Sequence, residues 1–174
     1  MRQGRGAAGM RVLGIDPGLG TTGYGVVELT ESGLRLCEAG TVRTRPRDPL
    51  PERLRALYEG ISEVIRECRP AVIALEGLYS EYRFPRTAIL MAHARGAVCL
   101  AAAHLDVPVA SYPPAQVKNA VVGVGNASKA QVQGTVQRMF ALADPPSPND
   151  VADALALAVT GCYRQGNPLV VNAR

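Results

Sequence analysis

The sequence predicts one α/β domain in which helices cover both faces of a mixed β-sheet. The chain has 174 residues, enough for a single stable hydrophobic core. Three closely spaced apolar segments come first, and later apolar segments alternate with helical patterns, an order typical of a mixed sheet. No apolar run approaches the roughly 20 residues that a membrane-spanning helix needs, so we expect no membrane partner.

The first half of the chain predicts three strands and one helix. Strands over 11–16, 22–29 and 34–44 are separated by short turns that contain glycine, which favours antiparallel hairpins. Over 48–68, apolar residues recur at helical spacing and charged residues occupy the other faces, which predicts an amphipathic helix. Pro70 then ends this helix.

The second half predicts strands that alternate with helices. A continuous apolar run over 71–78 indicates a short strand that is buried on both faces. The segment 85–106 is apolar nearly all around, so the helix that it predicts is either buried or part of an oligomer interface. The remaining elements are expected in the order of a strand over 107–112 and helices over 114–122, 128–142 and 148–165.

Residues 10–165 are therefore expected to form the domain, with a disordered extension over 1–9 and a short tail over 166–174. The four cysteines are far apart in sequence, which argues against a zinc site or a disulfide framework and favours a cytoplasmic setting. A net charge of +4 suits a polyanionic partner. Nearly all basic residues are arginines; the two lysines are Lys118 and Lys129.

Two acidic residues end otherwise apolar strands. Asp16 follows "RVLGI" and precedes a glycine-rich turn, although Asp-Pro-Gly is also ordinary turn chemistry. Glu76 lies in "AVIALEGLY", where an ionised carboxylate is costly to bury unless it is paired or binds a metal. Alternatively, Glu76 lies beyond the strand and is simply solvated. The carboxyl ends of strands in open α/β sheets are, however, also where ligands bind.

Two further carboxylates lie on one face of the last predicted helix. Asp150 and Asp153 are three residues apart in "SPNDVADALALAV". Asp150 has another explanation, because Ser147 and Asp150 fit a capping box with Pro148 at the first helical position. Asp153 is flanked by apolar residues on a largely buried helix, so we expect it to have a partner.

These four carboxylates together predict a site for hard cations. Clustered carboxylates repel one another unless a divalent metal lies between them, and oxygen-only ligands suit Mg²⁺ or Mn²⁺ rather than zinc. Two such ions, about 3.5–4 Å apart, can hold the attacking and leaving oxygens of a phosphodiester. The predicted metal ligands and catalytic residues are therefore Asp16, Glu76, Asp150 and Asp153, with two ions per site and Asp16 shared by both.

Five motifs occur in order along the chain: "GIDPGLGTTGYGVVE", "IALEGLY", "ARGAV", "QVKNAVVGVGNASKAQV" and "DVADALALAV". Together they closely resemble the bacterial RuvC family of Holliday-junction resolvases, over about residues 11–162. The resemblance implies a ribonuclease H-like fold and a homodimer that nicks two strands of a four-way DNA junction symmetrically. It assigns catalysis to the same four carboxylates, although some family members carry histidine at the position of Asp150.

The resemblance also implies several DNA contacts. Two lysines important in the family correspond to Lys118 and Lys129, and an aromatic family residue that contacts DNA corresponds to Tyr79. Arg86 is a further expected DNA contact, because the segment after Glu76 combines aromatic rings with guanidinium groups that suit unstacked bases. Whether Tyr82 and Phe84 contact DNA or a dimer partner is left open. The family further suggests work alongside the RuvA–RuvB branch-migration complex.

Other residues are expected to serve the structure. We interpret "GVGNAS" (123–128) as a turn between helices with Ser128 as the helix N-cap, because it follows a helix and lacks the ending of a phosphate-binding loop. His93 and His104 are interpreted as structural or interfacial, since they lie about 16 Å apart on one helix face. The glycines after Asp16 are expected to let a DNA backbone approach the metals.

Three alternative functions are weighed against the junction nuclease. A non-catalytic junction-binding scaffold would keep the basic surface but has no need of four carboxylates. A YqgF-type nuclease shares the motif of the first strand, but "VVGVGNASK" and the paired Asp150 and Asp153 favour the RuvC family. A sugar-kinase-like or actin-like ATPase shares the Gly/Thr-rich loop but needs two such domains and a far longer chain.

Overall fold

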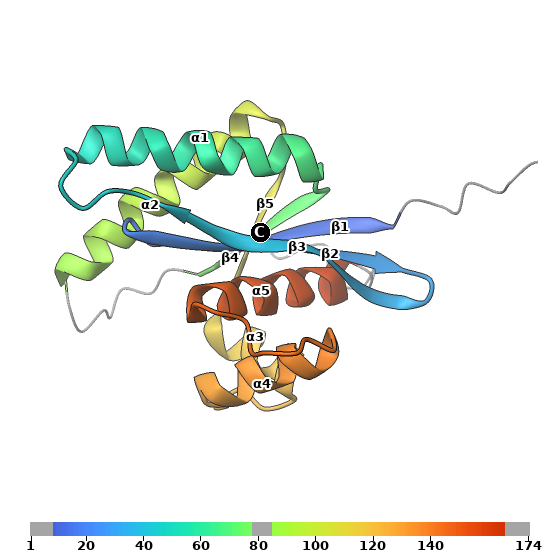
Figure 1. The fold of residues 1–174 in the computed structure, drawn as a ribbon. Coiled ribbons are helices and arrows are strands. Elements are labelled where there is room, and N and C mark those ends of the chain that lie inside the picture. Colours follow the sequence, from blue (N-terminus) through green and yellow to red (C-terminus); the bar gives the residue numbers. More distant parts are fainter. Residues whose placement is uncertain (1–8, 78–84, 166–174) are drawn as a thin grey trace, which may run out of the picture.

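A five-stranded mixed sheet forms the centre of the protein (Figure 1). The computed structural model describes residues 9–77 and 85–165. The strand order is β3-β2-β1-β4-β5; β1, β2 and β3 are antiparallel, whereas β4 runs parallel to β1 and β5 parallel to β4. The strands are β1 (Met10–Asp16), β2 (Thr21–Thr30), β3 (Gly33–Arg43), β4 (Val72–Glu76) and β5 (Val109–Tyr112).

Helices cover both faces of this sheet, as the sequence predicts (Figure 1). On one face lie α1 and α2, which pack against each other. On the other face, α5 crosses β1, β2 and β4, and α3 and α4 pack against the far side of α5. The helices are α1 (Leu50–Cys68), α2 (Pro85–His104), α3 (Pro114–Val122), α4 (Lys129–Met139) and α5 (Asn149–Gln165).

The alternation of side chains along β1 and β4 divides the core into two clusters. Leu13 and Ile15 face α1 and α2, together with Ile73 and Leu75 of β4. Val12 faces α5, together with Val72 and Ala74 of β4. Side chains alternate with a period of two along a strand. The last residues of β1 and β4, Asp16 and Glu76, therefore also lie on the α5 face.

Glycines on the same face allow α5 to lie unusually close to the sheet. A β-carbon at Gly14 would overlap the backbone of Ala154, and one at Gly23 would overlap the backbone of Asp150. A β-carbon at Gly25 would overlap the side chain of Leu155. The expectation that these glycines admit DNA is therefore wrong for Gly23, because α5 occupies that space.

Element boundaries differ from the predicted ones by a few residues. β4 ends at Glu76, two residues before the predicted end of the strand. α5 begins at Asn149, so Pro148 precedes the helix and the capping box predicted for Ser147 is wrong in its register. The expected extension and tail fall largely on 1–8 and 166–174, which are outside the described residues. Within the described ranges, no helix is long and apolar enough to cross a bilayer.

Candidate functional site

Asp16 and Glu76 lie at the same edge of the sheet. In the parallel pairing of β1 with β4, Gly14 is opposite Ala74 and Ile15 is opposite Leu75, so the next pair along both strands is Asp16 and Glu76. Both side chains are half-buried, and both belong to the α5 face. Glu76 is the last residue of β4, so it is neither deep inside the strand nor freely solvated.

The first turns of α5 bring two more carboxylates to this edge. Asp150 lies against Gly23, which pairs directly with Asp16 across β1 and β2. Asp153 is one turn further along α5, and although the helix is largely buried, the Asp153 side chain is 31% exposed. The expected partner is present: Lys129 Nζ lies 3.4 Å from Asp153 Oδ2.

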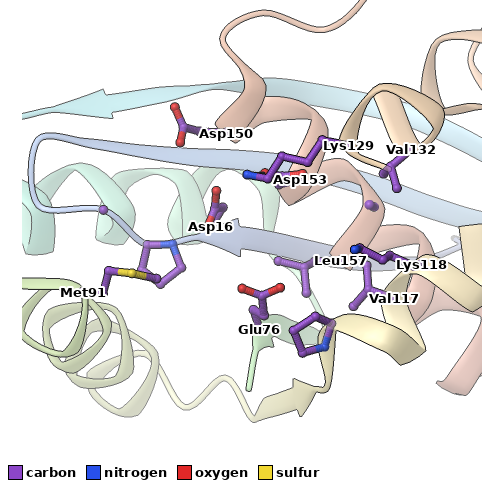
Figure 2. Close-up of a pocket in the computed structure, with 14 residues that line it drawn as sticks. Asp16, Glu76, Met91, Val117, Lys118, Lys129, Val132, Asp150, Asp153 and Leu157 are labelled. Carbon is purple, nitrogen blue, oxygen red and sulfur yellow. Dashed lines mark hydrogen bonds and ion pairs between the residues drawn. The ribbon is translucent and has the colours of Figure 1, made fainter. Parts of the chain in front are cut away.

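All four carboxylates line one cavity of about 430 Å³, together with Lys118 and Lys129. In Figure 2, Asp16 lies between the two carboxylates of α5 and the carboxylate of Glu76. Lys118 comes from α3, and Lys129 is the first residue of α4. Elements from the start, middle and end of the chain therefore meet here, and the structure brings together six of the eight residues predicted for the site.

A helix cap fixes the position of Lys129. The Ser128 hydroxyl accepts a hydrogen bond from the backbone N–H of Gln131, and the Gln131 side chain accepts one from the Ser128 N–H. This capping box starts α4 at Lys129, which confirms the predicted N-cap. Lys129 thereby projects from the helix start toward the acidic cavity (Figure 2).

Burial and neighbouring carboxylates disfavour the ionised forms of Asp16 and Glu76. Burial, followed by repulsion from Asp153, Asp150 and Glu76, raises the pKa of Asp16 to about 7. Burial and then repulsion from Asp153 raise the pKa of Glu76 as well. The Asp153 carboxylate in turn raises the pKa of Lys129. The cavity therefore carries more negative charge than its two lysines offset, which is the condition under which cations bind.

The donor set fits a hard divalent cation, but the side chains do not yet converge on one point. Among residues 9–77 and 85–165, no group of three or more His, Cys, Asp and Glu side chains is arranged to hold a metal ion. The four carboxylates nevertheless share one cavity, and they supply only oxygen ligands, which Mg²⁺ and Mn²⁺ prefer.

The remaining predicted residues lie elsewhere. Arg86 is exposed in the first turn of α2, and it does not line the cavity. Tyr79, Tyr82 and Phe84 are outside the described residues. His104 Nδ1 lies 2.9 Å from the Tyr58 hydroxyl, so this exposed side chain of α2 contacts α1. His93 lines a groove between α1 and α2.

Sequence reasoning missed Arg95, which lies on α2 beside the site. Its Nη1 donates a hydrogen bond of 2.7 Å to the backbone carbonyl of Glu76. Its Nη2 donates another, also of 2.7 Å, to the Ser111 hydroxyl on β5. Arg95 therefore ties the carboxyl end of β4 to its neighbouring strand. The motif "ARGAV" contains this residue, but its contacts are 19 and 16 residues away in sequence.

The strand order and the acidic edge define a class of protein. A mixed sheet that begins with three antiparallel strands, continues with parallel β4 and β5, and gathers carboxylates from β1, β4 and the last helix is a ribonuclease H-like α/β fold. A sequence model of the RuvC crossover junction endodeoxyribonucleases matches residues 12–161. The chain belongs to the RuvC family.

Individual relatives agree with this assignment. The crossover junction endodeoxyribonuclease RuvC of Rhodopirellula baltica is 50% identical over 160 residues, which cover 91% of this chain and 89% of that protein. The structure of Thermus thermophilus RuvC in complex with Holliday junction substrate matches with a TM-score of 0.83 and 39% identity, over 90% of this chain and 96% of that chain. The yeast mitochondrial Holliday junction resolvase Ydc2 shares the fold, with a TM-score of 0.63 at 14% identity.

Proposed function

We propose that this protein is a metal-dependent endonuclease that resolves Holliday junctions by paired symmetric nicks. The observation that carries the proposal is the convergence of four carboxylates and two lysines on one cavity. Family membership supports it, because a relative with a similar fold was solved in complex with a Holliday junction substrate. The described site thus combines groups for cations with groups for phosphates.

Within the site, the proposed roles follow from charge and position. Asp16, Glu76, Asp150 and Asp153 would hold Mg²⁺ or Mn²⁺, with two ions per site. Bound divalent cations supply the activation of water and the stabilisation of the leaving oxygen. Asp16 would be the central ligand, since it lies between Glu76 and the two carboxylates of α5 (Figure 2). Lys118 and Lys129 attract the phosphate of the strand to be cut.

A homodimer is part of the proposal, because two symmetric nicks require two sites. The described surface of α2 supports it: Ile89 and Leu100 are 58% and 51% exposed, respectively. A groove of about 510 Å³ between α1 and α2 is lined by Leu54, Tyr58 and Leu100, among others. A second copy would cover these apolar side chains. Action in the cytoplasm, DNA contacts of Tyr79 and Arg86, and cooperation with RuvA–RuvB remain predictions from the sequence and the family.

The decisive experiment is the cleavage of a labelled synthetic four-way junction and of a matched linear duplex, with Mg²⁺ and Mn²⁺ compared. The wild-type protein should cut the junction by paired nicks and leave the duplex intact. Asp16→Asn should bind the junction but not cut it. Full cleavage by Asp16→Asn would overturn the assignment of the site. A wild-type protein that binds junctions and never cuts them would instead be a scaffold.

A further inference from the structure

Three arginines follow one another at alternate positions where β3 leaves the sheet. Arg43 is the last residue of β3, and Arg45 and Arg47 lie in the connection to α1. All three are exposed. None of the ion pairs found within the described part of the chain involves them. We refer to Arg43, Arg45 and Arg47 as the arginine rim.

The rim is fastened to the turn that follows Asp16. Thr44 is buried and its N–H donates a hydrogen bond of 3.1 Å to the carbonyl of Gly20. The Thr44 hydroxyl donates to the carbonyl of Leu19 and accepts a bond of 3.0 Å from Arg53 Nε. Because neighbouring side chains in an extended segment point to opposite sides, the inward Thr44 turns Arg43 and Arg45 outward.

The strand register places the rim close to the cavity. Asp16 pairs with Gly23 of β2, Gly23 pairs with Thr41 of β3, and Arg43 is two residues further along β3. With neighbouring strands about 4.8 Å apart and a rise of about 3.3 Å per residue, the Cα atoms of Arg43 and Asp16 are about 12 Å apart. Figure 1 shows the start of the β3–α1 connection at the same end of the sheet as the β1–β2 turn.

We propose that the arginine rim binds the phosphate backbone of the duplex arm that flanks the cleaved bond, about three to four base pairs from the cut. This inference rests on the proposed function. Each strand of a duplex presents one phosphate per about 3.4 Å of axis, so about 12 Å corresponds to that separation. Guanidinium groups match phosphate geometry, and hydrogen bonds from Thr44 keep the rim at a fixed distance from Asp16.

The test is a salt titration of junction binding in metal-free buffer with EDTA, measured by fluorescence anisotropy. The Arg43→Gln/Arg45→Gln variant should lower the slope of log affinity against log salt by about 3.6, because the two protomers of the proposed dimer together lose four phosphate contacts and each contributes about 0.9. Its affinity should fall roughly 100-fold at about 0.1 M salt. The charge-matched control is Arg66→Gln/Arg138→Gln, which removes two exposed arginines near the last turns of α1 and α4. This control should keep the wild-type slope.

Methylphosphonates in the junction locate the contact. Neutral linkages about three and four nucleotides from the cut should lower the junction affinity of the wild-type protein but not that of Arg43→Gln/Arg45→Gln. Neutral linkages about nine nucleotides away should change the affinity of neither protein. An unchanged slope for the variant, or an equal loss in the Arg66/Arg138 control, would overturn the inference. Binding decides this question without cleavage, so a wild-type protein that fails to cut would count against the proposed function alone.

Discussion

The four carboxylates of the site are held by two different devices. Asp16 and Glu76 end β1 and β4, and backbone pairing between these parallel strands fixes them side by side. Asp150 and Asp153 are on α5, which reaches the sheet only because glycines leave room for it. The sheet-borne half therefore depends on hydrogen bonds that any sequence can make. The helix-borne half depends on glycines, which have no side chain at the positions where α5 approaches the sheet.

The two halves of the site therefore differ in how well they tolerate substitution. Strand pairing tolerates many substitutions, because the backbone makes the bonds. A close contact between a helix and a sheet tolerates no added carbon, since protein interiors have no free space for it. The two halves also act on each other: the pKa of Asp16 is raised by the carboxylates of α5, and Lys129 lies beside Asp153.

Gly23→Ala should break the helix-borne half and give the largest effect. The new β-carbon would overlap the backbone of Asp150, so α5 must move away from β2. A misplacement of about 1 Å in a catalytic site can cost roughly 100-fold in rate, and we expect junction cleavage to fall by at least about that factor. Overpacking should also lower the free energy of unfolding by about 1–3 kcal/mol. Single-turnover cleavage and urea unfolding measure the two losses.

Gly20→Ala is the matched control in the same turn region. A β-carbon at Gly20 meets no atom within 4 Å. Its free energy of unfolding should therefore stay within about 0.5 kcal/mol of the wild type, because the added carbon displaces no part of the protein. A folded Gly23→Ala protein that cuts at the wild-type rate would show that the contact with β2 does not position Asp150.

Lys129→Ala removes the cation beside the carboxylates of α5. The lysine lies 3.4 Å from Asp153, and we propose that it meets the phosphate to be cut. Loss of one preorganised cationic group should reduce cleavage roughly 100-fold, with a much smaller loss of junction affinity. Arg138→Ala, at the other end of α4, is the control and should retain cleavage. An equal loss of affinity for junction, duplex and single strand would make Lys129 a general electrostatic contact.

Arg95→Gln tests the half of the site that the sheet carries. It removes the hydrogen bonds that tie the Glu76 carbonyl to Ser111, so the end of β4 loses a support that backbone pairing does not provide. Outer-shell residues of metal sites typically contribute 10–100-fold, and we expect about a tenfold loss at limiting metal. The readout is the Mn²⁺ concentration that gives half-maximal cleavage, which should rise.

Two variants separate positioning by Arg95 from general stability. Ser111→Ala removes only one of the two contacts and should have a smaller effect. Arg95→Lys keeps a cation that can still reach one acceptor, so it should restore part of the metal dependence. If Arg95→Gln lowered the melting temperature and left the metal dependence unchanged, Arg95 would be a structural residue only.

An effect on stability alone, a rise in melting temperature of up to roughly 10 °C, reports how the two halves of the site are coupled. The pKa of Asp16 is raised from 3.8 to about 7, so the folded protein holds this proton more tightly than the unfolded chain. Ionising Asp16 therefore costs stability, and the cost grows as the pH rises from about 4 to about 7. Asp16→Asn removes this cost and should raise the melting temperature, by roughly 2–4 °C for each kcal/mol of stability gained in a chain of this size.

The measurement is a set of thermal melts of metal-free wild type and Asp16→Asn between pH 4 and pH 8. The advantage of Asp16→Asn should be small near pH 4, grow up to about pH 7 and then level off. Adding Mn²⁺ should stabilise the wild type and not the variant. An advantage that is the same at every pH would show that ionisation of Asp16 is not its cause.

Much of this arrangement could be predicted from local pattern. The hairpin strands, the buried β4 and the order of the helices were predicted correctly because each has its own periodicity or turn residues. Lys129 was also placed correctly, since its Ser128 cap is a local signal. Arg95 was missed because the carbonyl and hydroxyl that it contacts are on two other strands. No periodicity marks such a contact.

Local sequence patterns specify which residues carry charge and which face of each element they occupy. Alternation along β1 and β4 puts Asp16 and Glu76 on one face, and helical spacing does the same for Asp150 and Asp153. That these faces meet depends on how the elements pack against one another. The reason is steric: Gly14 and Gly23 have no side chain, and α5 fills the space that a β-carbon would otherwise occupy.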